Sequence, residues 1–476
     1  MNARAVHLAR AVRGEVAEAM AARMPIERGA ASDDLPAESL ARFIAGRYLY
    51  QHIASLRAAG EDAPSTADEE AAVDLVVAML FGLGVLQLFV DDPEVENIDV
   101  NGAETAFVTY CDGTKEMVGP VAASDDELVA TVRSAAAHFG LAERRFDVAQ
   151  PELDLRLPDG SRLSAVMSVT AAPTIDIRRH RLSDYRLGDL VELGMVDADL
   201  AAFLSAAVRA KRNVLVSGAM NAGKTTLLRA LAGEISPHER IVTIEQALEL
   251  GLDRQLDRHP DCVAMEARPP NIEGVGAISM ARLVRRSLRM NASRVIVGEV
   301  LGDEVIPMLN AMSQGRSGSM ATVHADSSAA VFRRLAAYAV QAPERLPIEA
   351  TNLLIAGAIH FVVHVDVEET CYSRPGVEGG PGVEGGPGVE GGPGVGDMPW
   401  ENATRRGPKV GVFRRVTSVR EIVDADGPYI VSNELFRLSP TGEVQRAAPL
   451  RDQTASALAL HGYEQASCGQ GGVARW

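Results

Sequence analysis

The sequence predicts an α/β protein in which a parallel sheet with covering helices is preceded by a smaller α+β domain and a helical N-terminal segment. Three observations lead to this fold class. Apolar strand-like and helix-like stretches alternate from residue 213 to about 367. Short strands surround one helix between residues 91 and 181, and residues 1–90 are rich in Ala, Glu and Arg with helical periodicity. A chain of 476 residues has room for about three such units.

The N-terminal segment, residues 1–90, is expected to be helical with a polar interruption at 59–66. Its longest apolar run, Leu75–Val90, is broken by glycines and is short for a membrane span, so we expect a buried helix that ends at those glycines. No apolar signal core follows Met1. These features predict a soluble, cytoplasmic protein without direct membrane insertion.

The following region, residues 91–181, is expected to form a small α/β domain. A linker at 182–196 then leads into a helix at 197–210, which opens the larger domain of residues 197–450. Residues 451–476 are expected to be a C-terminal tail. In the small domain we expect a helix at Asp125–Phe139 and strands at Val95–Val100, Ala106–Tyr110 and Leu153–Leu157.

Three copies of Pro-Gly-Val-Glu-Gly-Gly and a shortened fourth occupy residues 375–396. Such a segment has too few apolar side chains to form a core, so we expect it to be disordered. It separates the apolar run Ile359–Val367 from the strand-like Val410–Val416, which favours an expanded hairpin loop. A role in partner binding is the alternative interpretation.

Composition limits the classes of partner. The net charge is −17 with a pI near 5.1, which argues against a broad basic face for nucleic acid. One local basic stripe exists at 281–290, where four arginines recur at helical spacing. We interpret it as a solvated or subunit-facing surface, with nucleic acid in a ring pore as the alternative. The four cysteines are far apart in the sequence and predict reduced thiols instead of a disulfide or zinc framework.

The most informative segment is Gly218–Thr225, which fits the phosphate-binding pattern G-x-x-x-x-G-K-[ST] without a gap. In this pattern backbone N–H groups surround phosphate oxygens, the Lys reaches the β- and γ-phosphates and the hydroxyl can hold Mg²⁺. A buried strand precedes the segment and a helix follows it, so the helix N-terminus faces the anion. The predicted nucleotide-binding residues of this loop are Gly218, Ala219, Met220, Asn221, Ala222, Gly223, Lys224, Thr225 and Thr226.

Three further polar positions follow apolar strands downstream of the loop. Glu245 stands after one strand, with Glu249 four residues on, and Glu299 and His324 end two others. Polar groups at the carboxyl ends of parallel strands converge on the ligand crevice. There a carboxylate can orient Mg²⁺ or deprotonate the attacking water, and an imidazole can sense or stabilise the γ-phosphate.

With these motifs in this order, the chain resembles the secretion ATPases of the type II/IV superfamily, and most closely their Tad/Flp pilus-assembly branch. Stretches beginning at Asp92, Leu157 and Arg268 match as well, and the resemblance covers roughly residues 70–440 without the repeats. It implies a RecA-like P-loop NTPase domain that binds ATP against the N-terminal domain. It also implies a homo-oligomeric, hexameric ring working on a pilus or secretion platform at the cytoplasmic face of the inner membrane.

The resemblance also assigns roles to single positions. Lys224 and Thr225 correspond to the Walker A pair, and Glu299 to the Walker B acid, so that Thr225 and Glu299 would hold Mg²⁺ directly or through water. Glu245 and Glu249 correspond to the acidic Asp box, and His324 to the second histidine of the His box. Arg162 and Arg178 match arginines of the N-terminal domain that reach nucleotide phosphates, with a structural ion pair as the alternative. Whether Glu245 or Glu299 is the general base stays open.

The chain departs from the family pattern at three charged positions. Gln246, Leu301 and Arg316 replace the usual Asp, Arg and His. We therefore keep three hypotheses. The first is an ATP-hydrolysing hexameric motor for pilus assembly or protein secretion, and the second is a nucleotide-binding ring subunit with weak or no hydrolysis. The third is a DNA-transport ATPase of the conjugation type, although no nucleic-acid partner is expected.

Overall fold

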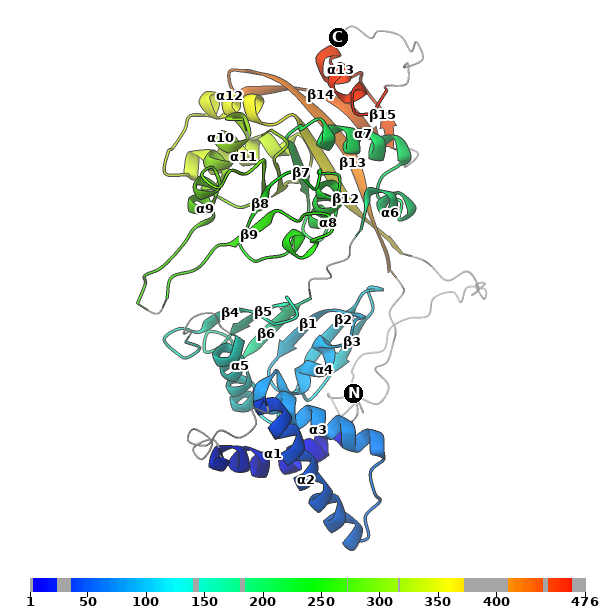
Figure 1. Ribbon diagram of the computed structural model, residues 1–476, viewed down its shortest axis with the longest axis vertical. Helices are drawn as coiled ribbons and strands as arrows, with labels where there is room; N and C mark the ends of the chain where they lie inside the picture. Colours follow the sequence, from blue (N-terminus) through cyan, green and yellow to red (C-terminus); the bar gives the residue numbers. More distant parts are fainter. Residues whose placement is uncertain are drawn as a thin grey trace, which may run out of the picture.

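The computed structural model describes residues 3–23, 36–139, 145–179, 185–271, 273–315, 317–371, 410–439 and 444–464. Along the long axis of the molecule a helical bundle, a small domain and a large α/β domain follow one another (Figure 1). None of the described helices is long and apolar enough to cross a membrane. The repeats at 375–396 and Arg316 lie outside the described residues.

The N-terminal segment forms a bundle of three helices, α1 (Ala3–Arg23), α2 (Ala37–Ala58) and α3 (Thr66–Phe81). The polar interruption predicted at 59–66 separates α2 from α3. The Ser65 hydroxyl accepts a hydrogen bond from the Asp68 N–H, which caps α3, and Gly82 ends that helix as predicted. Apolar residues of all three helices make the bundle core, and two short turns, η2 (Gly84–Leu86) and α4 (Gln87–Val90), lead onward.

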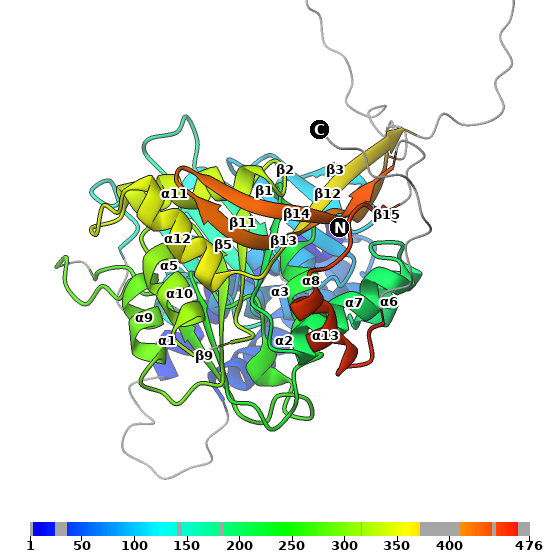
Figure 2. The ribbon, with the colours of Figure 1, turned by 90° about the horizontal axis from the view of Figure 1, so that it is seen from above.

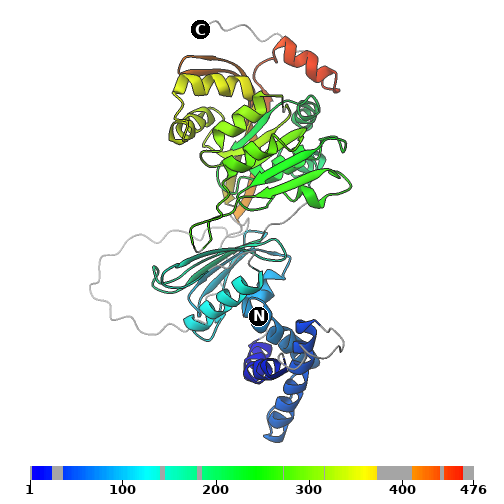
Figure 3. The ribbon, with the colours of Figure 1, turned by 60° about the vertical axis from the view of Figure 1, so that its left-hand side comes forward.

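The small domain is a six-stranded antiparallel sheet with one covering helix, α5 (Asp125–Phe139), whose apolar side packs against the sheet. The other face of the sheet is directed toward the large domain (Figure 3). The expected helix and strands of this region are confirmed. The strand order is β3-β2-β1-β6-β5-β4, with β1 (Val95–Asn101), β2 (Ala106–Tyr110), β3 (Lys115–Val118), β4 (Glu152–Arg156), β5 (Arg162–Val166) and β6 (Thr174–Arg178).

The large domain contains a nine-stranded sheet in the order β15-β14-β13-β12-β7-β11-β10-β8-β9. Neighbouring strands from β12 to β9 run parallel, as the alternating pattern predicts, and β13 to β15 add antiparallel strands at one edge. The strands are β7 (Val214–Gly218), β8 (Ile241–Glu245), β9 (Cys262–Glu266), β10 (Arg294–Val300), β11 (Met320–His324), β12 (Phe361–Cys371), β13 (Val410–Asp426), β14 (Tyr429–Leu438) and β15 (Val444–Arg446).

Helices cover both faces of this sheet (Figure 2). One apolar core joins the sheet to α6 (Leu187–Glu192), α7 (Ala198–Arg209), α8 (Lys224–Ala232) and α13 (Asp452–Ala459). The other joins it to α9 (Met280–Ser287), α10 (Val305–Ser313), α11 (Ala330–Gln341) and α12 (Ile348–Ala358). A 3-10 turn, η3 (Leu252–Arg254), follows β8.

Two segments are more ordered than the sequence predicts. Residues 182–196, interpreted as a linker, include α6, because Leu187 and Leu190 bury their side chains in the core of the large domain. Residues 451–476, interpreted as a tail, include α13, which the Arg451 and Thr454 side chains anchor by hydrogen bonds to the buried Glu421. The domain boundaries themselves stay a prediction.

Strands β12 and β13 pair antiparallel up to the backbone of Cys371 opposite that of Val410. The residues between them therefore connect two adjacent strand ends. The interpretation of residues 375–396 as an expanded hairpin loop stays a prediction, because they lie outside the described residues.

Candidate nucleotide-binding site

The phosphate-binding loop lies where the topology places a ligand crevice. β7 ends at Gly218 and α8 begins at Lys224, with β12 and β11 on either side of β7. Gly218 has to be glycine, because a Cβ there would come within 2.3 Å of the Val365 carbonyl oxygen on β12. Gly223 has a φ of 90° and Asn221 a φ of 61°, so the loop turns through left-handed conformations before the helix.

The remaining residues of the loop differ in exposure. Ala219 and Met220 are exposed at its tip, the Met220 side chain to 74%, whereas Ala222 is buried beneath it. Thr225 and Thr226 stand half-buried in the first turn of α8, where backbone N–H groups have no partner within the helix.

Lys224 is the central cation of the site. Its ammonium donates a hydrogen bond of 2.7 Å to the Ala219 carbonyl oxygen and another of 3.0 Å to His324 Nδ1. Burial, together with the charge of Arg178, lowers the pKa of Lys224 to about 8 against the opposing charges of Glu299 and Glu249. The site therefore holds a positive charge whose burial makes an anionic ligand favourable.

His324 connects Lys224 to Glu299. An ammonium can only donate, so His324 Nδ1 accepts and its ring proton sits on Nε2, which lies 2.5 Å from Glu299 Oε1. This Glu299 oxygen is buried and has no well-aligned hydrogen-bond donor among the described residues. Lys224, His324 and Glu299 thus form a continuous chain at the ends of β7, β11 and β10.

Glu245 has different surroundings. Its side chain is only 2% exposed, and its Oε2 accepts hydrogen bonds from the Glu249 N–H at 2.6 Å and the Leu250 N–H at 2.8 Å. Burial raises the pKa of Glu245 to about 7, against the effect of those two donors. The carboxyl group therefore fixes the loop after β8, and Glu249 supplies one of the N–H groups that hold it.

The two arginines of the small domain lie opposite each other on β5 and β6. Arg178 extends to the loop and donates a 2.7 Å hydrogen bond to the Asn221 side-chain oxygen. Arg162 lies 4.0 Å from Asp154 on the neighbouring strand, with both side chains largely exposed. The structure thus brings Arg178 to the loop. Arg162 lies opposite Arg178 on the neighbouring strand and is paired with Asp154.

One residue at the loop carries no motif in the sequence. Arg414 on β13 donates a 2.8 Å hydrogen bond to the Asn221 carbonyl oxygen. It stands 193 residues after Asn221 and beyond the repeats, so only the pairing of β12 with β13 brings it there.

Two of the three positions that depart from the family pattern, Gln246 and Leu301, are described by the structure. Gln246 is exposed, and the Leu301 side chain is 47% exposed. The turn that contains Leu301 is held by the buried Glu304 carboxylate, which accepts hydrogen bonds from the Leu301 and Gly302 N–H groups. A charge at 246 or 301 would therefore face outward in the single chain.

The residues present fit a Mg-nucleotide. Lys224, Arg178 and Arg414 supply cations for phosphates, and the partly exposed Glu299 carboxylate, whose Oε1 makes no well-aligned hydrogen bond with the described residues, suits a metal-bound water. Among the described residues, no group of three or more His, Cys, Asp or Glu is placed to hold a metal by itself. Mg²⁺ at phosphate sites is commonly held by one or two protein groups together with the phosphates.

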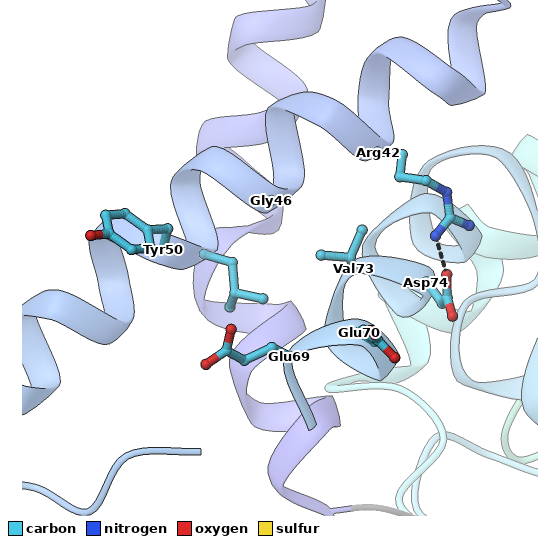
Figure 4. Close-up of a pocket in the computed structure, with 8 residues that line it drawn as sticks. Arg42, Gly46, Tyr50, Glu69, Glu70, Val73 and Asp74 are labelled. Carbon is cyan, nitrogen blue, oxygen red and sulfur yellow. Dashed lines mark hydrogen bonds and ion pairs between the residues drawn. The ribbon is translucent and has the colours of Figure 1, made fainter. Parts of the chain in front are cut away.

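The basic stripe lies away from this loop, on α9. Its four arginines are exposed, and α9 ends at Ser287, so that the last of them follows the helix. Arg285 forms an ion pair with Glu344 at 2.8 Å. A separate cavity of about 530 Å³ opens between α2 and α3 of the N-terminal bundle, lined by Gly46, Tyr50 and Val73 among others (Figure 4).

Comparison with known proteins agrees with this geometry. The family model described as "Type II/IV secretion system protein" matches residues 83–372. The chain belongs to the type II/IV secretion system protein family. The matched residues include the small domain, the phosphate loop, Glu299 and His324, whereas the N-terminal bundle and Arg414 lie outside them.

The names of individual relatives refer to conjugal transfer and to type IV secretion. A putative conjugal transfer protein of Mycobacterium tuberculosis (strain CDC 1551) is 34% identical over 295 residues, which are 60% of this chain and 80% of that protein. The type IV secretion system protein VirB11 of Brucella suis is 28% identical over 62% of this chain and 88% of its own. The Legionella pneumophila ATPase DotB overlaps 61% of this chain and 76% of its own, with 19% identity and a TM-score of 0.45.

Proposed function

We propose that the protein is a Mg-dependent ATPase that hydrolyses ATP to ADP and phosphate and drives a secretion or pilus-assembly machine as a hexameric ring. The observation that carries the proposal is the chain of contacts from Lys224 through His324 to Glu299 at the phosphate loop. A γ-phosphate that binds Lys224 would compete for its hydrogen bond to His324. His324 could then contact the phosphate, and Glu299 could orient water or Mg²⁺.

The assignment to the Tad/Flp branch, the contact with an inner-membrane platform and the peripheral cytoplasmic location belong to the same proposal. The platform contact is supported by the family and by the names of relatives such as VirB11, whereas the branch is supported only by the sequence motifs. Arg178 supports the proposed function further, because its hydrogen bond to Asn221 joins the small domain to the phosphate loop, where a nucleotide would be held between domains.

The decisive experiment measures phosphate release by the full chain with Mg-ATP, beside Lys224→Ala, together with the oligomeric mass. We expect turnover that depends on Mg²⁺, a loss of about 100-fold or more in Lys224→Ala, and a mass of about six subunits in the presence of nucleotide. A native protein that releases no phosphate, even with its membrane partners, would contradict the ATPase proposal.

A nucleotide-binding ring subunit with weak hydrolysis is the second candidate. It is favoured by Gln246 and Leu301, which leave two positions on the outer side of the site without the usual charges. Restoring both charges in Gln246→Asp and Leu301→Arg should then raise turnover severalfold above the native level. Robust native turnover would exclude this candidate. Stimulation of turnover by DNA would instead point to the conjugation-type motor suggested by the M. tuberculosis relative's name.

A further inference from the structure

Three cations meet at the phosphate loop, each on a different part of it. Lys224 binds the Ala219 carbonyl, Arg178 binds the Asn221 side chain, and Arg414 binds the Asn221 carbonyl. None of the three forms an ion pair with a carboxylate among the described residues. Other arginines of the large domain do, including Arg240, Arg285, Arg294, Arg446 and Arg451. Like charges gathered at one loop repel one another unless an anion joins them.

Arg414 lies on the side of the sheet that carries the loop. Arg414 and Val416 are two residues apart on β13 and therefore share one face of the strand. The Val416 side chain belongs to the core shared with α6, α7 and α8. The Val416 N–H donates to the Met195 carbonyl at 2.9 Å, which ties β13 to the segment before α7. A Cβ on Gly223 would lie 3.3 Å from both Arg414 Cδ and Met195 Cε, so the aliphatic part of Arg414 packs directly on the loop.

The guanidinium of Arg414 retains donors for a ligand. Only its Nε is used, in the hydrogen bond to the Asn221 carbonyl, and the described residues give no partner to its two terminal nitrogens. A guanidinium offers parallel N–H donors that match two oxygens of one phosphate. Because Asn221 is part of the phosphate-binding pattern, these donors lie beside the place where that pattern holds its anion.

We propose that Arg414 is a nucleotide-binding residue that contacts the polyphosphate from the β12–β13 hairpin, while Arg178 reaches the same loop residue, Asn221, from the small domain. This inference rests on the proposed nucleotide-binding function. It adds a phosphate contact from a strand beyond the residues that match the family, and it couples nucleotide occupancy to the hairpin that leads to the glycine repeats.

The test uses the full chain with Arg414→Gln, and Arg415→Gln as the matched control. Arg415 is the neighbouring cation on the opposite face of β13. Dissociation constants are measured for ATP, ADP and adenosine, with the melting temperature of each ligand-free variant. We expect Arg414→Gln to weaken ATP and ADP binding about tenfold and adenosine binding by less than about twofold. Arg415→Gln should change none of the three constants beyond about twofold.

Two results would overturn the inference while the proposed function stands. The first is a dissociation constant for ATP in Arg414→Gln that lies within about twofold of the native value. The second is an equal loss for adenosine and ATP, which would mean that Arg414 only supports the shape of the loop. A native chain that binds neither ATP nor ADP would overturn the proposed function as well. If Arg414→Gln does not fold, Arg414→Lys replaces it, with Arg415→Lys as the matched control. We then expect the ATP affinity of Arg414→Lys to fall about threefold or more.

Discussion

The neighbouring strands β8 and β10 both bring an acid to the nucleotide site, and the two acids differ in every contact. Glu245 at the end of β8 is buried and accepts two backbone N–H groups. Glu299 on β10 is about one-third exposed, and among the described residues its Oε1 contacts His324 Nε2 without a well-aligned hydrogen bond. A carboxylate that accepts two backbone N–H groups maintains structure, whereas one that contacts an imidazole and is partly exposed can also bind water or a metal.

The two strands are also fitted to each other. Gly298 precedes Glu299, and a Cβ on it would come within 2.9 Å of Glu245 Cγ. The absence of a side chain at 298 therefore gives Glu245 its space beneath the crevice, while the next residue extends toward Lys224. From this comparison we infer that Glu299 is a better candidate than Glu245 for the general base, or for the carboxylate that holds a Mg²⁺-bound water.

The largest expected effect separates the two acids by turnover. Glu299→Gln keeps the shape of the side chain and removes its charge, so the site loses a base or a ligand for metal-bound water. We expect turnover to fall about 100-fold or more, with the ATP dissociation constant changed by less than about fivefold. Steady-state phosphate release and equilibrium ATP binding measure the two quantities.

Glu245→Gln is the control, because an amide oxygen can still accept the N–H groups of Glu249 and Leu250. It should retain turnover within about tenfold of the native level. If Glu245→Gln lost more turnover than Glu299→Gln, the assignment of the general base would move to Glu245 and the comparison would be reversed.

The second prediction separates the acids by stability. Glu245→Ala leaves one buried and one partly buried backbone N–H group without their acceptor, so we expect the free energy of unfolding to fall by about 2–3 kcal/mol. Glu299→Ala removes no well-aligned hydrogen bond and should cost less than about 1 kcal/mol. Urea unfolding without nucleotide measures both variants. Equal losses would show that Glu299 also has a structural role.

The sequence predicts much of this site because its information is local. The helix expected at Asp125–Phe139 has the same bounds as α5, since its apolar spacing and acidic first turn are both visible in the sequence. The order of strand ends likewise predicts that Lys224, Glu299 and His324 converge, because parallel strands present their carboxyl ends at one edge.

The rest depends on contacts that sequence spacing does not encode. Glu245 and Glu299 both follow apolar strands, and only the loop conformation after β8 turns N–H groups toward one of them. Arg414 reaches the loop because the pairing of β12 with β13 sets it opposite Val367. The repeats separate these two residues in the sequence, so their spacing does not predict the pairing. The helix α6 was missed because six residues give too little periodicity to recognise.

The smallest expected effect concerns Lys224, the cation linked to Glu299 through His324. Burial lowers the pKa of Lys224 to about 8 in the free protein, and bound phosphates would favour the charged form. Nucleotide binding would therefore take up a proton above pH 8, and affinity should fall as pH rises. We expect the ATP dissociation constant to rise about tenfold between pH 7 and 9.

Lys224→Arg provides the matched variant, because a guanidinium stays charged over this range. Whatever its affinity for ATP at pH 7 relative to the native protein, that affinity should be nearly independent of pH up to 9. Equilibrium titrations at constant ionic strength compare the two slopes, which removes the effect of screening on phosphate binding. Parallel slopes in the native protein and Lys224→Arg would assign the pH dependence to another group. The buried ammonium of Lys224 would then be charged throughout, held so by the carboxylate of Glu299 despite its burial.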